Sequence, residues 1–182
     1  MSRSNPKKRK PRVAKQTVLA AGEGQTEEAF LKFLRELFGD RNDDIKIDVC
    51  VAPPGSPKSM VVQVCKRSPE NYDRAFLLLD TDVLWLRGLA ESAEENNDLV
   101  LIGSDRCVEG LFLSILNPGK DYSTWQSKTC KREFHKLLSK DEKLIARNYS
   151  KVFTKKKLLE ARKRIPALDQ LLTLMFPGKE LR

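Results

Sequence analysis

Acidic residues recur at the points where apolar, strand-like segments of the sequence end. Glu23 lies between two glycines after one such segment, Asp80 and Asp82 follow a second, and Asp105 and Glu109 follow a third. Two carboxylates about 4 Å apart repel by roughly 4 kcal/mol at an effective dielectric near 20, so such a group requires protons or a cation. All-oxygen ligands favour a hard ion, which predicts Mg²⁺ or Mn²⁺ rather than zinc.

The spacing of these acids suggests individual roles. Asp80 and Asp82 are two residues apart, and in an extended segment this directs both side chains the same way. We expect Glu23, Asp80 and Asp82 to form the catalytic, metal-binding group, and Glu109 to bind a second ion or to orient Arg106. The alternative is that the two aspartates only form a turn and that Glu23 is a loop residue. Their joint position at strand ends favours the metal site.

Gly24 has a separate interpretation, as a phosphate-binding position. A glycine lets the backbone turn sharply and leaves space for a phosphate after the first strand. The P-loop pattern and the G-x-G-x-x-G pattern are both absent, which disfavours ATP hydrolysis and dinucleotide binding.

The order of elements predicts the architecture that would position these acids. Apolar runs with strand character cover 16–22, 45–51, 74–79 and 99–102, and helical periodicity covers 26–38, 57–67, 84–95 and 107–116. Alternation of strands and helices predicts an α/β fold with a mostly parallel four-stranded sheet and helices on both faces. In such sheets, sites lie at the carboxyl ends of the strands, where these acids fall.

Charge divides the chain into three parts. The 182 residues carry a formal net charge of +9. Residues 1–16 are basic without acids and predict a disordered tail, which also looks like a nuclear localisation signal. Residues 17–126 have an acidic excess and form the predicted α/β domain. Residues 127–182 predict a basic helical extension packed on that domain, with helices near 128–138 and 154–175 and a break or kink at Pro166.

An acidic centre flanked by basic segments predicts contact with nucleic acid. Carboxylates would hold a cation while lysine and arginine side chains bind the phosphate backbone of DNA or RNA. The alternative is that the basic segments only aid solubility. The residues assigned to phosphate or nucleic-acid binding are Gly24, Arg106, Lys128, Lys131, Arg132, Lys151 and Lys155.

Other chemistries and locations are disfavoured. The four cysteines lack the C-x-x-C spacing of zinc sites and indicate reduced, buried thiols. The single histidine, His135, lies in a basic helix and is a poor candidate for a nucleophile–histidine mechanism. The chain shows neither a secretory signal nor an apolar run of about 20 residues, which predicts a cytoplasmic protein without a membrane segment.

These motifs resemble a known group of enzymes. Glu23-Gly24 and Asp80-Thr81-Asp82 resemble the Toprim superfamily. The string from Glu23 to Glu28, the string from Ser104 to Leu113 and the basic Tyr149-Ser150-Lys151 before a long helix look more narrowly like the RloB-like family. That family more often has Asn-Pro where this chain has Asp105-Arg106, and a large residue at Gly110, but Glu109 is retained. The resemblance covers most of residues 17–175.

The resemblance implies a Toprim-like fold and Mg²⁺-dependent nucleic-acid cleavage, often in bacterial anti-phage systems. It also implies an ABC-type ATPase as a partner, and a homodimer is a further expectation. The resulting hypothesis is a metal-dependent phosphodiesterase. Two alternatives remain: a non-catalytic subunit that binds an ATPase or nucleic acid, and a nucleotide-sugar transferase that uses the D-x-D motif.

Overall fold

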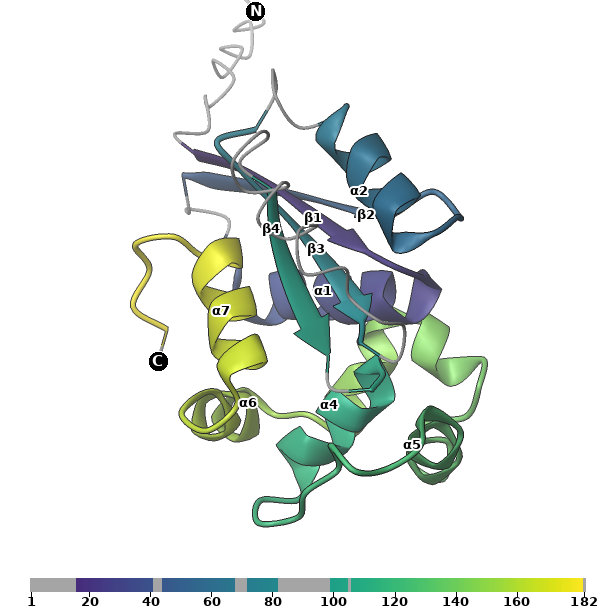
Figure 1. Cartoon of the computed structure of the whole chain (residues 1–182). Coiled ribbons are helices and arrows are strands. Elements are labelled where there is room, and N and C mark those ends of the chain that lie inside the picture. The colour runs from purple at the N-terminus through teal and green to yellow at the C-terminus, as the bar shows by residue number, and fades with distance from the viewer. Residues whose placement is uncertain (1–15, 41–43, 68–71, 82–98, 105, 182) are drawn as a thin grey trace, which may run out of the picture.

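Four parallel β-strands form the centre of the molecule (Figure 1). The computed structural model describes residues 16–40, 44–67, 72–81, 99–104 and 106–181. The strands are β1 (Gln16–Gly22), β2 (Ile45–Val51), β3 (Arg74–Asp80) and β4 (Leu99–Ser104). Their order in the sheet is β2-β1-β3-β4, and every neighbouring pair is parallel. The predicted α/β class and parallel four-stranded sheet are confirmed.

Helices connect and cover the strands. They are α1 (Gln25–Phe38), α2 (Pro57–Cys65), α4 (Val108–Leu116), α5 (Ser127–Phe134), α6 (Lys155–Arg162) and α7 (Pro166–Met175), with 3₁₀ helices η1 (Glu142–Leu144) and η2 (Ala146–Lys151). Local chemistry explains several of their starts. The Ser56 hydroxyl accepts from Ser59 N–H and caps α2, whose first residue is a proline. Thr154 caps α6 in the same way, through the N–H of Lys157.

The sheet separates two apolar clusters, so helices cover both of its faces as predicted. Alternate residues of β1 point to opposite sides: Val18 and Ala20 join the larger cluster, and Leu19 and Ala21 join the smaller one. Helix α2 covers the smaller cluster, and α1, α4 and α7 lie on the other side (Figure 1). Because β3 is covered on both faces, its run from Ala75 to Leu79 is buried throughout.

The C-terminal residues share the larger cluster with the rest of the chain. Phe30 of α1 and Phe112 of α4 pack against Tyr149 and Phe153, with ring centroids 5.4 to 5.8 Å apart. Each aromatic side chain buried in this way contributes about 1.5–3 kcal/mol. Helix α7 also contacts β1, β3 and β4 directly. The described part of the C-terminal segment, residues 127–181, therefore completes the core on this face of the sheet.

Two predicted helices end differently in the structure. The segment 128–138 was too long a prediction: α5 ends at Phe134, and turns carry the chain on to Leu138, whose side chain is buried. The segment 154–175 is two helices, because Pro166 cannot continue a helix and instead begins α7 at its first position. The predicted break at Pro166 is confirmed.

Some predictions fall outside the described residues. The basic tail, except for its last residue Gln16, and the helix over 84–95 lie there. None of the helices within the described ranges is long and apolar enough to span a membrane. All four cysteines are described, and none forms a disulfide.

Candidate cation site at the carboxyl edge of the sheet

The carboxyl ends of β1 and β3 bring Glu23 and Asp80 together. The strands are parallel neighbours with Gly22 opposite Leu78, and the Glu23 N–H donates to the Leu78 carbonyl at 3.0 Å. The Glu23 carboxylate then accepts the backbone N–H of Asp80, with an Oε2–N distance of 2.8 Å. This is the edge of an open parallel sheet where ligands bind.

The Asp80 side chain is held by two donors from the next strand and helix. Its Oδ1 accepts the Ser104 hydroxyl at 3.0 Å and the Val108 N–H at 2.8 Å. Burial, followed by the negative charges of Glu27 and Glu23, raises the pKa of Asp80 to about 7, although the two hydrogen bonds oppose the shift. The ionised form of Asp80 is therefore poorly stabilised by the protein alone.

Glu27 belongs to this group of acids as well, and it lies in the first turn of α1, where an acid also stabilises the start of a helix. Its side chain is buried at 6% exposure, and its Oε2 accepts the Gly24 N–H at 2.9 Å. Burial raises the pKa of Glu27, and the charges of Glu109 and Glu23 add to the effect. A signal was present in the sequence: Glu27 follows Glu23 by four residues, at the point where a strand turns into a helix.

Glycine at position 22 makes this close turn possible. A β-carbon on Gly22 would lie 2.6 Å from Glu27 Cβ and 2.9 Å from Glu28 N. No side chain fits such a gap, so the first turn of α1 can approach β1 only with glycine there. At Gly24, a β-carbon would lie 3.0 Å from Glu27 Oε2, the end of a flexible side chain.

Glu109 lies at the inner end of the group and pairs with a lysine. Its side chain is 2% exposed and its Oε1 contacts the ammonium of Lys143, which is 10% exposed. Among the described residues, its second oxygen, Oε2, has no hydrogen-bond partner. Glu109 was predicted to bind a second ion or to orient Arg106, whereas here its direct charge partner is Lys143.

Arg106 is held in an uncommon backbone conformation next to the site. Its φ of +63° lies in the left-handed region, which non-glycine residues seldom adopt. The Arg106 N–H donates to Thr81 Oγ1 at 3.0 Å, and its Nε–H donates to the Ser123 carbonyl at 2.8 Å. These bonds fix Arg106 beside Thr81, the residue that follows Asp80. Its guanidinium, assigned above to phosphate binding, is exposed there.

Asp82 and Asp105 lie outside the described residues. Within the described ranges, no group of three or more His, Cys, Asp and Glu side chains is placed to hold a metal ion. Glu23 and Asp80 nevertheless suit a divalent cation. One oxygen of each accepts protein N–H or O–H groups, and no described residue donates to Asp80 Oδ2 or Glu23 Oε1. A cation would offset the charge that burial disfavours on Asp80.

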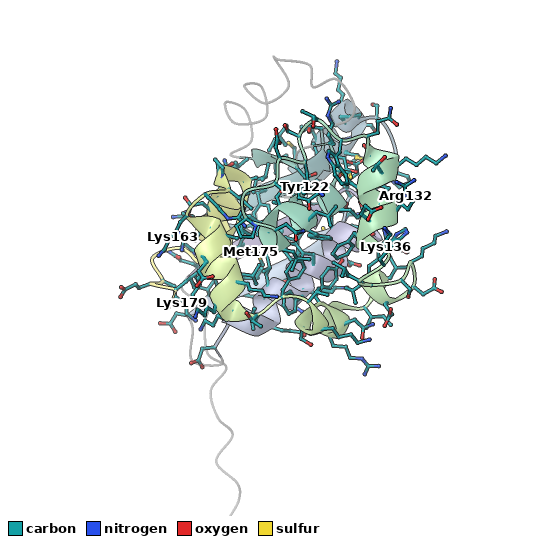
Figure 2. The ribbon with its side chains drawn as sticks, turned by 90° about the horizontal axis from the view of Figure 1, so that it is seen from below. Tyr122, Arg132, Lys136, Lys163, Met175 and Lys179 are labelled. Atoms are coloured by element: carbon teal, nitrogen blue, oxygen red, sulfur yellow. The ribbon has the colours of Figure 1, made fainter. Side chains whose placement is uncertain are left out.

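The predicted basic contacts are spread over the surface rather than gathered at the site. Lys128 and Arg132 are exposed on α5, which begins beside the site because the Ser127 hydroxyl donates to the Arg106 carbonyl at 3.3 Å. Figure 2 shows Arg132 of α5 and Lys136 of the following turn on one side of the molecule and Lys163 and Lys179 on the opposite side. Lys131, also on α5, is half-buried.

Lys151 and Lys155 are less well placed. The ammonium of Lys151 lies 2.6 Å from Glu142 Oε1. Lys155 lies over the ring of Phe38, 5.5 Å from its centroid. Phe38 is the last residue of α1, and the first turn of α1 is at the site. Because α1 has 14 residues and rises 1.5 Å per residue, Phe38 and the Lys155 ammonium above it lie about 20 Å from the start of the helix. Lys155 is therefore remote from the carboxylates.

The histidine and cysteines do not join the site chemistry. Burial of the imidazole and the nearby charge of Lys143 lower the pKa of His135, which favours its neutral form. Burial raises the pKa of Cys107 to about 12, so its thiol stays protonated near neutral pH. Cys65, Cys107 and Cys130 are buried, as predicted for the cysteines, whereas Cys50 is half-buried.

No family model, curated protein or solved structure matches this chain. The resemblance to Toprim and RloB-like proteins, carried by Glu23-Gly24 and Asp80-Thr81-Asp82, therefore remains an expectation from the sequence. The carboxylate geometry provides the basis for a functional proposal.

Proposed function

We propose that this protein is a cytoplasmic, metal-dependent nuclease with a Toprim-like fold, which cleaves phosphodiester bonds of DNA or RNA. The supporting observation is the contact between Glu23 and Asp80 at the carboxyl edge of the parallel sheet. Asp80 is held there in a setting that raises its pKa to about 7. A divalent cation bound there would favour the ionised form of this carboxylate at neutral pH.

The residues have distinct roles in this proposal. Asp80 and Asp82 would hold Mg²⁺, either directly or through water, and Glu23 would complete the site or act as the general acid or base. A bound Mg²⁺ would polarise the scissile phosphate and stabilise charge on its oxygens. Ser104 and the N-terminus of α4 keep Asp80 in place through its Oδ1.

The basic residues near the start of α5 provide the substrate contacts in the proposal. Lys128 and Arg132 are exposed, and Arg106 is fixed between them and the strand ends. Their charges neutralise phosphates on either side of the scissile bond and displace bound counterions from the nucleic acid. Because counterion release is less favourable at high salt, binding weakens as the salt concentration rises.

A cleavage assay tests the proposal. The purified protein is incubated with DNA, RNA and tRNA in Mg²⁺ or Mn²⁺, and in parallel with EDTA. We expect cleavage of at least one substrate that EDTA abolishes. Asp80→Asn and Glu23→Gln should each lower the rate at least about 100-fold, as expected for the loss of an acid–base or metal-binding group.

Glu36→Gln is the matched control, because Glu36 is an exposed glutamate of α1 away from the strand ends. It should keep the wild-type rate. Activity that survives both site substitutions would rule out this site. Nucleic-acid binding without cleavage, unchanged by chelators, would instead support the non-catalytic binding subunit.

A further inference from the structure

The pair formed by Glu109 and Lys143 is almost completely buried. Glu109 comes from the first turn of α4, and Lys143 comes from η1, 34 residues later in the chain. Removing two charges from water is costly and is tolerated only when they compensate each other. Lys143 therefore places one positive charge beside Glu109, at the inner end of the group of acids that also includes Glu23, Glu27 and Asp80.

Lys143 is fixed by its backbone as well as by its charge. Its N–H donates to the Ser139 carbonyl at 3.1 Å. The Tyr149 hydroxyl lies 2.9 Å from the Lys143 carbonyl and 3.2 Å from the Thr26 carbonyl, and can donate to either. Thr26 belongs to the first turn of α1, immediately before Glu27. The segment that carries Lys143 is thus attached to the same helix start that forms the site.

The pair also acts on the position of Asp80. Val108 and Glu109 are the first two residues of α4, and the Val108 N–H donates to Asp80 Oδ1 at 2.8 Å. Because Glu109 follows Val108 directly, the contact of Glu109 with Lys143 also holds in place the Val108 N–H that orients Asp80. A divalent cation bound to Glu109 would lie against the ammonium of Lys143 and be repelled by it.

We propose that Lys143 is a positioning residue of the cation site. It neutralises Glu109, so that Glu109 binds no metal and instead holds the start of α4 against Asp80, while the cation binds at the Glu23 and Asp80 end. This inference rests on the proposed function, because it assigns a role relative to the same cation. Glu109 Oε2, which lacks a partner among the described residues, is the one atom through which Glu109 could act as a ligand.

A charge-rescue experiment separates these roles. Mn²⁺ dissociation constants are measured by electron paramagnetic resonance for the wild type, Glu109→Met, and the double variant Glu109→Met/Lys143→Met. Glu109→Met alone leaves a buried, uncompensated ammonium at the start of α4, whose Val108 N–H orients Asp80, so Mn²⁺ affinity should fall by about 10-fold or more. Removing Lys143 as well should restore the affinity to within about threefold of the wild type, because methionine approximates the shape of both side chains.

Each outcome decides the question. A double variant that binds Mn²⁺ as weakly as Glu109→Met makes Glu109 a metal ligand and overturns the inference. A Glu109→Met variant with wild-type affinity also overturns it, because the pair would then have no effect on the site. If the wild type binds no Mn²⁺ at all, the proposed function itself fails, and this result is distinct from a failed rescue.

Two further variants keep the test decisive. Melting temperatures verify folding, and Glu109→Gln/Lys143→Met replaces the double variant if the latter does not fold. The control is Glu133→Met/Lys136→Met, which removes a surface pair between α5 and the turn after it, with an Nζ–Oε2 distance of 2.5 Å. This control should leave both the Mn²⁺ affinity and the melting temperature unchanged, because exposed pairs contribute little.

Discussion

The Cβ of Glu27 lies 2.6 Å from the position that a β-carbon on Gly22 would take. This contact sets how closely the first turn of α1 approaches the end of β1. It places the buried Glu27 carboxylate next to Glu23 and Asp80, where its charge raises the pKa of Asp80. The electrostatics of the site therefore depend on the absence of a side chain at position 22.

Gly22→Ala should destabilise the protein by about 1–3 kcal/mol, because the added methyl group forces the start of α1 away from β1. Urea denaturation measures the change in the free energy of unfolding. Gly24→Ala is the comparison, since its β-carbon would meet only the end of the Glu27 side chain at 3.0 Å. An equal effect of the two substitutions would contradict the packing argument.

The pKa of Asp80 predicts a pH dependence of stability in the absence of metal. Its value rises from 3.8 to about 7 on folding, so the folded state keeps a proton that the unfolded state loses. The free energy of unfolding should therefore fall as pH rises from about 4 to about 7, and Asp80→Asn should remove this contribution. Denaturation in EDTA at several pH values measures it.

The comparison must use the difference between wild type and variant, because other groups titrate with the opposite sign. Lys151 and Ser139 lower the pKa of Glu142 to about 2, which adds stability as pH rises through the acid range.

Mg²⁺ should raise the melting temperature more at about pH 8 than at about pH 5, where Asp80 is protonated. Equal shifts at both pH values would contradict binding at Asp80.

Ser104→Ala should cost about 1 kcal/mol of stability and weaken cation binding near neutral pH. The buried Ser104 hydroxyl lies 3.0 Å from Asp80 Oδ1 and 3.1 Å from the Leu79 carbonyl. Its hydrogen bond lowers the pKa of Asp80, so its removal raises that pKa further. Denaturation and a Mn²⁺ titration check both effects. Ser114→Ala, which removes a hydroxyl bonded to the Gly110 carbonyl, serves as control.

Nucleic-acid binding should depend on salt in a position-specific way. Lys128→Ala and Arg132→Ala should each weaken binding and reduce the slope of log affinity against log salt by about one. Lys155→Ala should change the slope less, because Lys155 lies at the far end of α1 beside Phe38. Fluorescence anisotropy over a salt series measures the slopes, with Lys46→Ala on β2 as control. Equal slopes for all four variants would argue against a contact surface at α5.

Local patterns in the sequence determined most of the fold. Apolar patterns located the strands, with β1 and β2 at their observed bounds. The run of β1 is apolar because helices cover both of its faces, whereas β2, a half-buried edge strand, shows alternation. Pro166 marked the start of a helix for a purely local reason, its fixed φ and missing N–H. The position of Glu23 and Asp80 at strand ends follows from the same local information together with the parallel order of the sheet.

Only the tertiary structure decided how charges from distant segments meet. The pairing of Glu109 with Lys143 spans 34 residues and depends on how η1 packs against α1, which no periodicity encodes. Likewise, a basic run in sequence does not reveal that Lys155 lies over Phe38, at the end of α1 remote from the carboxylates, while α5 begins next to Arg106. Periodicity specifies which side chains are buried, whereas electrostatic partners are set by the three-dimensional path of the chain.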